Sequence, residues 1–272
     1  MRILSFMLLI VVILLAGCSS NPVSPDQQQV VLQGYLYAKE PVRDIYVASS
    51  KAIGGSDSVE NPITTASVVL IRSGVRYQLA PNSSQPGYFL YNGNDLVVNT
   101  GDDFRIEIDA NGQHVTAETI VPPTPEQMLL SRNTLHFQTD SVQARFGGIR
   151  TVINGLDTAM VTWSNTNGDY FFVVIESIDP NRQLMRPDST FTRRFISQPT
   201  NQATYTVSPN SILYTGQHVL RLYRVNKEYA DLYRSRVQDS RTLNEPLTNV
   251  QNGLGIFSAF ASDSAYFNVF MH

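Results

Sequence analysis

The stretch Phe104-Arg105-Ile106-Glu107-Ile108-Asp109-Ala110-Asn111-Gly112 decides the fold class of this chain. Apolar Phe104, Ile106 and Ile108 alternate with charged residues, and a period of two is typical of a β-strand with one buried face. Asn-Gly is the strongest short signal for the turn of a β-hairpin. The stretch therefore predicts a strand, a tight turn and a return strand over Val115–Val121.

Similar strand patterns extend outward on both sides of this hairpin. Tyr170–Glu176 is a continuous apolar run, so we expect it to be buried on both faces or nearly so. The other segments that favour strands are 30–37, 44–48, 66–71, 75–79, 87–91, 158–163, 217–225, 253–260 and 265–270. We find no internal repeat, and the sequence predicts a mostly β protein.

A proline-rich segment, Val121-Pro122-Pro123-Thr124-Pro125, interrupts this pattern. Proline removes a backbone donor and stiffens the chain, so strands should not pair across it. We place a domain boundary there, between residues 30–121 and 122–272, and expect each unit to fold on its own. The predicted fold is two tandem antiparallel immunoglobulin-like β-sandwiches, with one short helix in the second.

That helix is predicted after Asn226, which can cap it. Tyr229, Leu232 and Tyr233 would share one helical face. The single tryptophan, Trp163, is expected in the core of the second sandwich rather than on a ligand platform.

The first residues form a bacterial lipoprotein signal. Arg2 precedes an apolar run, Ile3–Leu15, which is too short to span a bilayer because that takes about 20 residues. Leu15-Ala16-Gly17-Cys18 matches the lipobox pattern, with Cys18 as the lipid acceptor. The alternative is an ordinary secretory signal that contains a cysteine. Cys18 is the only cysteine of the chain, which favours the anchor.

We therefore assign residues 1–17 to a lipoprotein signal peptide and residues 18–29 to a flexible tether. The tether is polar and proline-containing and cannot bury enough apolar surface to order itself. An acylated Cys18, carrying palmitate-like chains, would anchor the protein permanently. Ser19 rather than Asp follows Cys18, which resembles the default for sorting to the outer membrane. The face of that membrane, periplasmic or surface, is left open.

Composition excludes several classes of function. The formal net charge is −3 without any run of like charges, which argues against a nucleic-acid partner. None of the histidines (His114, His136, His218 and His272) has metal-ligand spacing, and Gly-x-Ser-x-Gly is absent. We thus assign no catalytic residue, no metal and no cofactor, and we expect no enzyme activity; a hydrolase is kept as a third class.

Three further groups of residues could form sites, but each also has a simpler structural explanation. Asp95, Asp102 and Asp103 could join a calcium site, but aspartate favours turns anyway and the EF-hand spacing is missing. The chain has 13 tyrosines, and exposed ones such as Tyr35 and Tyr37 could stack on sugars or on a partner, although strands favour aromatics. Gly253–Phe257 lacks the lysine of a phosphate loop and favours a strand with a bulge or a close backbone approach.

Several of these motifs together resemble known families. Ala66–Leu70, Gly87–Phe89 and Phe104–Ile108 resemble a transthyretin-like or carboxypeptidase-regulatory-like sandwich. Val161–Trp163 and Tyr170–Ile175 resemble the early core strands of a fibronectin-type-III-like sandwich.

With the lipobox, the Tyr229–Tyr233 helix and Asn252–Phe257, the arrangement resembles the DUF4249 lipoproteins of Bacteroidota and relatives. That family has no established reaction, and its members resemble outer-membrane accessory lipoproteins that often occur beside TonB-dependent transporters. The resemblance implies a lipid-anchored, non-catalytic accessory protein of a TonB-dependent uptake system. The alternative is a stand-alone surface lipoprotein that binds carbohydrate or acts as an adhesin.

Overall fold

The computed structural model describes residues 28–50, 61–143, 149–155, 157–185, 194–235 and 248–271. The expected signal peptide, Cys18, and the expected tether up to residue 27 lie outside the described residues. Gln28 and Gln29, the last residues of that tether, are hydrogen-bonded to the first sheet. Ser49 Oγ donates to Gln28 Oε1 at 3.0 Å, and Gln29 N donates to Ser50 Oγ at 2.8 Å.

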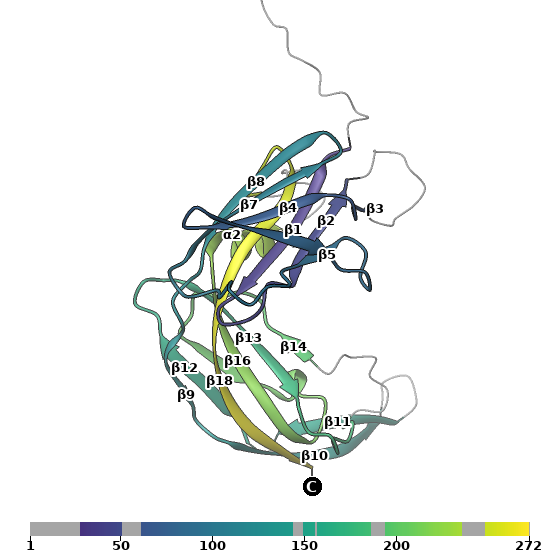
Figure 1. The fold of residues 1–272 in the computed structure, drawn as a ribbon. Helices are drawn as coiled ribbons and strands as arrows, with labels where there is room; N and C mark the ends of the chain where they lie inside the picture. Colours follow the sequence, from purple (N-terminus) through teal and green to yellow (C-terminus); the bar gives the residue numbers. More distant parts are fainter. Residues whose placement is uncertain are drawn as a thin grey trace, which may run out of the picture.

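The described chain is mostly β, as predicted (Figure 1). The first half contains β1 (Val30–Tyr37), β2 (Asp44–Ser49), β3 (Asn61–Pro62), β4 (Ser67–Arg72), β5 (Val75–Pro81), β6 (Tyr88–Leu90), β7 (Asp103–Ala110) and β8 (Gln113–Ile120). The second half contains β9 (Glu126–Leu130), β10 (Thr134–Gln143), β11 (Ile149–Gly155), β12 (Ala159–Ser164), β13 (Tyr170–Ser177), β14 (Arg194–Ile196), β15 (Thr204–Val207), the 3-10 helix η1 (Pro209–Ser211), β16 (Gly216–Val225), α2 (Lys227–Ser235), β17 (Val250–Gln251) and β18 (Leu254–Met271).

The hairpin predicted from Asn111-Gly112 is confirmed. β7 pairs with β8 in the register Ile108 to Val115. Asn111 and Gly112 have φ angles of 51° and 74°, the left-handed pair that a tight hairpin turn requires. Phe104, Ile106 and Ile108 are fully buried, so the alternation correctly identified the core face of this strand.

The first sandwich closes around β5. This strand pairs with β6 in one layer, which also holds β2 and β1, and with β4 in the other layer, which also holds β7, β8 and β17. The core between the layers is mostly aliphatic and contains three fully buried phenylalanines, Phe89, Phe104 and Phe257.

The second sandwich packs the sheet β14-β13-β16-β18 against the three strands β15-β12-β9. Its core contains Trp163, which is 5% exposed and lies 5.4 Å from the Phe171 ring. The core position predicted for Trp163 is confirmed. The prediction for Tyr170–Glu176 also holds, since Phe171 to Ile175 are all buried.

β18 runs through both halves of the molecule. Its first part, to Phe260, pairs in parallel with β1, and its later part pairs antiparallel with β16. The two strands expected at 253–260 and 265–270 are therefore one. Residues 250–260, which the sequence assigned to the second unit, complete the first sandwich, because Val250, Phe257 and Ala259 lie in its core. Figure 1 shows the two halves as an arc along this strand.

An aromatic cluster fills the junction between the halves. Phe172, Tyr223 and Phe260 form its buried part, and Tyr35, Tyr37 and Tyr229 pack against them. The predicted helix is α2, and its Tyr229 ring meets Phe260 edge-on at 4.9 Å. Tyr35 and Tyr37 do share one face, as expected, and they contribute to this junction.

Asn226, expected to cap α2, immediately precedes this helix, and its side-chain amide contacts the first sandwich. Its Nδ2 donates to Thr119 Oγ1 at 2.8 Å and to the Ile120 carbonyl at 2.9 Å. No helix among the described residues is long and apolar enough to cross a membrane.

Candidate functional site

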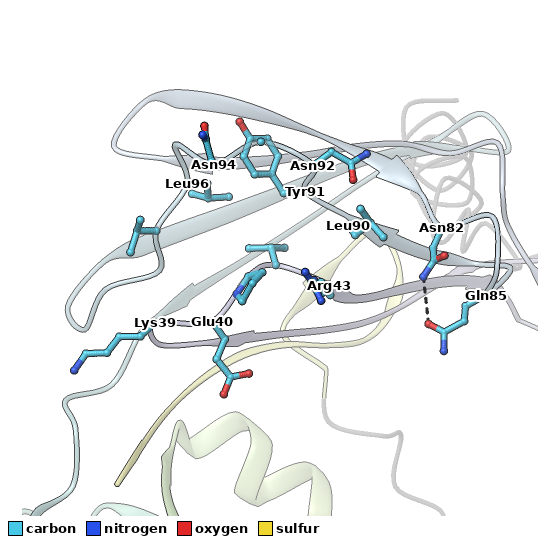
Figure 2. A pocket seen from close by; sticks show the side chains of 14 residues that line it. Lys39, Glu40, Arg43, Asn82, Gln85, Leu90, Tyr91, Asn92, Asn94 and Leu96 are labelled. Carbon is cyan, nitrogen blue, oxygen red and sulfur yellow. Dashed lines mark hydrogen bonds between the residues drawn. The ribbon is translucent and has the colours of Figure 1, made fainter.

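A polar pocket lies at one end of the first sandwich, between three loops (Figure 2). The loops join β1 to β2, β5 to β6 and β6 to β7. The cavity volume is about 770 Å³, within the range of about 300–1,000 Å³ that is typical of small-molecule pockets. It is lined by charged side chains (Lys39, Glu40, Arg43), amides (Asn82, Gln85, Asn92, Asn94), Tyr91, and an apolar group that includes Val42, Leu90 and Leu96.

Backbone hydrogen bonds tie these loops to one another. Lys39 N donates to the Val98 carbonyl at 2.8 Å, and Tyr91 N donates to the Val42 carbonyl at 2.9 Å. Asn82 N donates to the Tyr88 carbonyl at 2.8 Å, which closes the β5–β6 loop. Val42 and Leu96 are buried and anchor the loops in the core. The walls of the pocket are thus fixed by the sandwich.

Tyr91 is held in one orientation at the wall of the pocket. Its ring packs edge-on against Tyr77 at 5.5 Å, and its hydroxyl donates to Asp95 Oδ1 at 2.5 Å. This hydrogen bond raises the pKa of Tyr91 and lowers that of Asp95. The Tyr91 ring lies close to Gly93, where a side chain would not fit, because a Cβ at this position would lie 2.4 Å from the Tyr91 hydroxyl oxygen.

Most of the polar side chains of the pocket have no partner among the residues that the structure describes. Among the described residues, Lys39, Glu40, Arg43, Asn92 and Asn94 make no side-chain hydrogen bond or ion pair. In Figure 2 one hydrogen bond joins lining side chains, from Asn82 Nδ2 to Gln85 Oε1 at 3.3 Å. The pocket therefore presents exposed donors and acceptors beside a fixed aromatic ring, which suits reversible binding of a polar molecule.

The aspartates weighed as a calcium site are not brought together. Asp95 accepts from Tyr91, while Asp102 Oδ2 accepts from Asn99 N at 3.0 Å and lies 3.5 Å from Arg72 Nη1. Asp103 begins β7. No group of three or more potential metal ligands occurs within the described part of the chain.

Each histidine in the described residues has a local partner. His114 Nδ1 lies 2.7 Å from Asp109, and His136 Nδ1 lies 2.7 Å from Asp157, whose pKa the hydrogen bond lowers. His218 is buried against the Phe267 ring, and burial lowers its pKa. His272 lies outside the described residues. His114, His136 and His218 therefore each have a partner within the protein.

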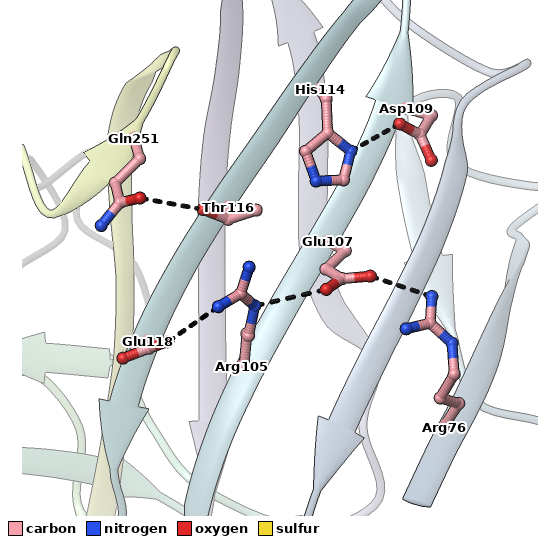
Figure 3. Close-up of polar contacts among 8 residues, drawn as sticks. All are labelled: Arg76, Arg105, Glu107, Asp109, His114, Thr116, Glu118 and Gln251. Carbon is pink, nitrogen blue, oxygen red and sulfur yellow. Dashed lines mark hydrogen bonds and ion pairs between the residues drawn. The ribbon is translucent and has the colours of Figure 1, made fainter. Parts of the chain in front are cut away.

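Side chains of β5, β7 and β8 form a charge ladder (Figure 3). Glu107 lies 2.9 Å from Arg76 and 3.3 Å from Arg105, which in turn lies 3.2 Å from Glu118. The opposite charges alternate, so the ladder has no basic surface of the kind that nucleic acid requires. Such exposed pairs contribute little to stability, and we regard the ladder as solvated.

The close backbone approach expected in Gly253–Phe257 is confirmed. Gly255 has φ = 106°, and a Cβ there would lie 1.9 Å from the Leu32 carbonyl oxygen. Leu32 pairs with Gly255 where β1 joins β18. The glycine thus serves strand pairing.

The pocket was not anticipated from the sequence. Its residues fall in segments that pattern analysis treats as turns, and only Asn92-Gly93-Asn94 beside an aromatic residue gave a local signal. Cys18, the expected lipidation site, lies outside the described residues.

The family model described as "Domain of unknown function (DUF4249)" matches residues 20–265, which is most of the chain. No curated protein matches.

Proposed function

The chain belongs to the DUF4249 family, and we propose that it is a lipid-anchored accessory protein of the outer membrane that binds without catalysing a reaction. The observation that carries this proposal is Leu15-Ala16-Gly17-Cys18, a lipobox whose cysteine is the only one of the chain. The ordered sheet begins at Val30, so a short segment separates the anchor from the first sandwich.

A TonB-dependent transporter is the partner that we propose, by analogy with the genomic setting of similar lipoproteins. The structure supports a binding role in general terms. Loops held on a rigid sandwich commonly carry recognition, and here they enclose a pocket at one end of the first sandwich. The absence of catalysis is part of the proposal and rests on the sequence, which has no nucleophile elbow and no second thiol.

A stand-alone carbohydrate-binding lipoprotein is the second candidate. The amide-rich pocket around Tyr91 is the observation that favours it. The two candidates differ in whether a membrane partner is needed, and not in whether the pocket is used.

The anchor is tested by metabolic labelling with an alkyne fatty acid. Wild-type protein should be labelled, whereas Cys18→Ser should be unlabelled and retain its signal peptide. Equal labelling of both would overturn the anchor assignment.

The partner is tested by affinity purification from detergent-solubilised membranes, followed by mass spectrometry. We expect an outer-membrane β-barrel to co-elute with the tagged protein and to be absent from an unrelated tagged lipoprotein. Turnover of peptide, ester or glycoside substrates by the purified protein would contradict the non-catalytic part of the proposal.

A further inference from the structure

We propose that the loop pocket of the first sandwich is a glycan-binding site for a neutral oligosaccharide, with Tyr91 as the stacking ring and Asn92 and Asn94 as hydrogen-bonding residues. This inference deepens the proposed binding function and rests on it. It needs neither the anchor nor a transporter, so it can fail separately.

The amide side chains of the pocket match the hydroxyl groups of a sugar. A sugar hydroxyl is both a donor and an acceptor, and a carboxamide also offers both. Asn92 and Asn94 are exposed, follow Tyr91 closely in the sequence, and make no side-chain hydrogen bond within the described residues. Figure 2 shows both amides on the same wall as the Tyr91 ring.

The Tyr91 ring is preorganised at the wall of the pocket. An aromatic side chain offers an apolar face at small entropic cost when it is already immobilised. The Tyr77 ring packs against the Tyr91 ring at an interplanar angle of 88°, and Asp95 accepts a hydrogen bond from the Tyr91 hydroxyl. A pyranose ring, which has apolar C–H faces and polar edges, fits a fixed ring flanked by amides.

The charged side chains of the pocket partly balance one another. The negative charge of Glu40 partly balances the positive charges of Lys39 and Arg43. The lining therefore has no concentrated positive charge that would select a polyanion. Glu40 is also the one carboxylate among the lining residues, which is too few for a divalent cation site. A lining rich in charged and amide groups also disfavours an apolar ligand. The lining thus disfavours a polyanion, a divalent cation and an apolar ligand, and it suits a neutral molecule rich in hydroxyl groups.

The test uses the detergent-purified full-length chain on an array of immobilised neutral and acidic oligosaccharides. We expect retention by at least one neutral oligosaccharide. Asn92→Ala/Asn94→Ala should weaken this binding about tenfold or more, which corresponds to about one hydrogen bond. The matched control is Asn181→Ala/Gln202→Ala, which removes two exposed amides that do not line the pocket and should bind like wild type.

A second pair of variants tests the ring. Tyr91→Phe keeps the stacking face, so its affinity for the oligosaccharide should stay within a few-fold of wild type. Tyr91→Leu removes the aromatic ring and should lower that affinity about tenfold. Thermal unfolding of each variant checks that the sandwich is intact.

Three outcomes would overturn the site: no retention of any neutral oligosaccharide, equal binding by the pocket and control double variants, or retention of polyanions alone. None of these outcomes would alter the fatty-acid labelling or the recovery of a β-barrel.

Discussion

At the scale of single residues, Trp163 gives the most direct probe of the second core. It is 5% exposed and packs against Phe171. Trp163→Ala should lower the free energy of unfolding by about 3–5 kcal/mol, the usual cost of truncating a large aromatic core residue. Urea denaturation measures this loss.

The fluorescence of the same residue is an independent check. A buried indole should emit at short wavelength and resist iodide. Emission typical of water-exposed indole would contradict the burial of Trp163.

Because His218 is buried, we expect the stability of the protein to depend on pH. Burial depresses its pKa below the ordinary value of 6.5, against the opposing effects of the Gly216 carbonyl and Asp179. The unfolded chain therefore binds a proton at this position more readily than the folded chain. The stabilisation by neutral His218 is present above pH 6.5 and is lost as the pH falls below it.

We expect the free energy of unfolding of wild type to fall more than that of His218→Gln between pH 7.5 and pH 5. Denaturation curves at several pH values measure the difference, which isolates His218 from the carboxylates. Parallel pH profiles for the two proteins would show that His218 does not titrate as its burial predicts.

At the scale of elements, the junction of β1 with β18 depends on Gly255. Alanine there would meet the Leu32 carbonyl oxygen, in addition to adopting an unfavourable positive φ. Gly255→Ala should therefore destabilise the protein by more than the 1–3 kcal/mol or so that strain alone costs.

Gly74→Ala is the matched control, because Gly74 also has a positive φ but has open space around it. It should cost only about 1–2 kcal/mol. If thermal or urea unfolding gives equal losses for the two variants, close packing at Gly255 is not the cause.

The sequence predicts individual strands better than their partners. Alternation identified β7, the Asn-Gly turn fixed the hairpin to β8, and the apolar run identified β13. It did not reveal that β1 pairs with β18, because parallel pairing between distant segments leaves no local pattern. It also divided β18, since Ser262, Asp263 and Ser264 are polar and lie where the strand leaves one core for the other.

The pocket was missed for a related reason. Arg43, Asn82 and Asn92 come from three separate loops, and only the folded sandwich brings them together. Turn-forming residues indicate where the chain reverses and do not indicate which loops converge.

Because β18 is shared by both halves, we expect the two halves to unfold together. It supplies Phe257 to the first core, Phe260 to the junction cluster and Phe267 to the second core. We expect one cooperative urea transition, with the same midpoint by Trp163 fluorescence and by far-ultraviolet circular dichroism. Fragment 30–121 should not fold alone, because it lacks residues 250–260. Two separate transitions, or a stable fragment 30–121, would restore the expectation of independent units.

At the scale of the whole molecule, the shared strand makes the arc a single body that presents the loop pocket. A lipid on Cys18 would keep that body within reach of proteins embedded in the same membrane. This arrangement suits an accessory protein that holds a ligand or a partner near a transporter, and it requires no chemistry from the protein itself.

Crosslinking in intact cells tests most directly the central claim, that the protein is a lipid-anchored accessory partner of an outer-membrane transporter. We predict that the wild-type protein captures an outer-membrane β-barrel at higher yield than unrelated lipoproteins do, and that Cys18→Ser loses most of that yield. Capture of no barrel by the wild-type protein, together with direct binding to purified polysaccharide, would contradict the claim and favour a stand-alone carbohydrate-binding lipoprotein.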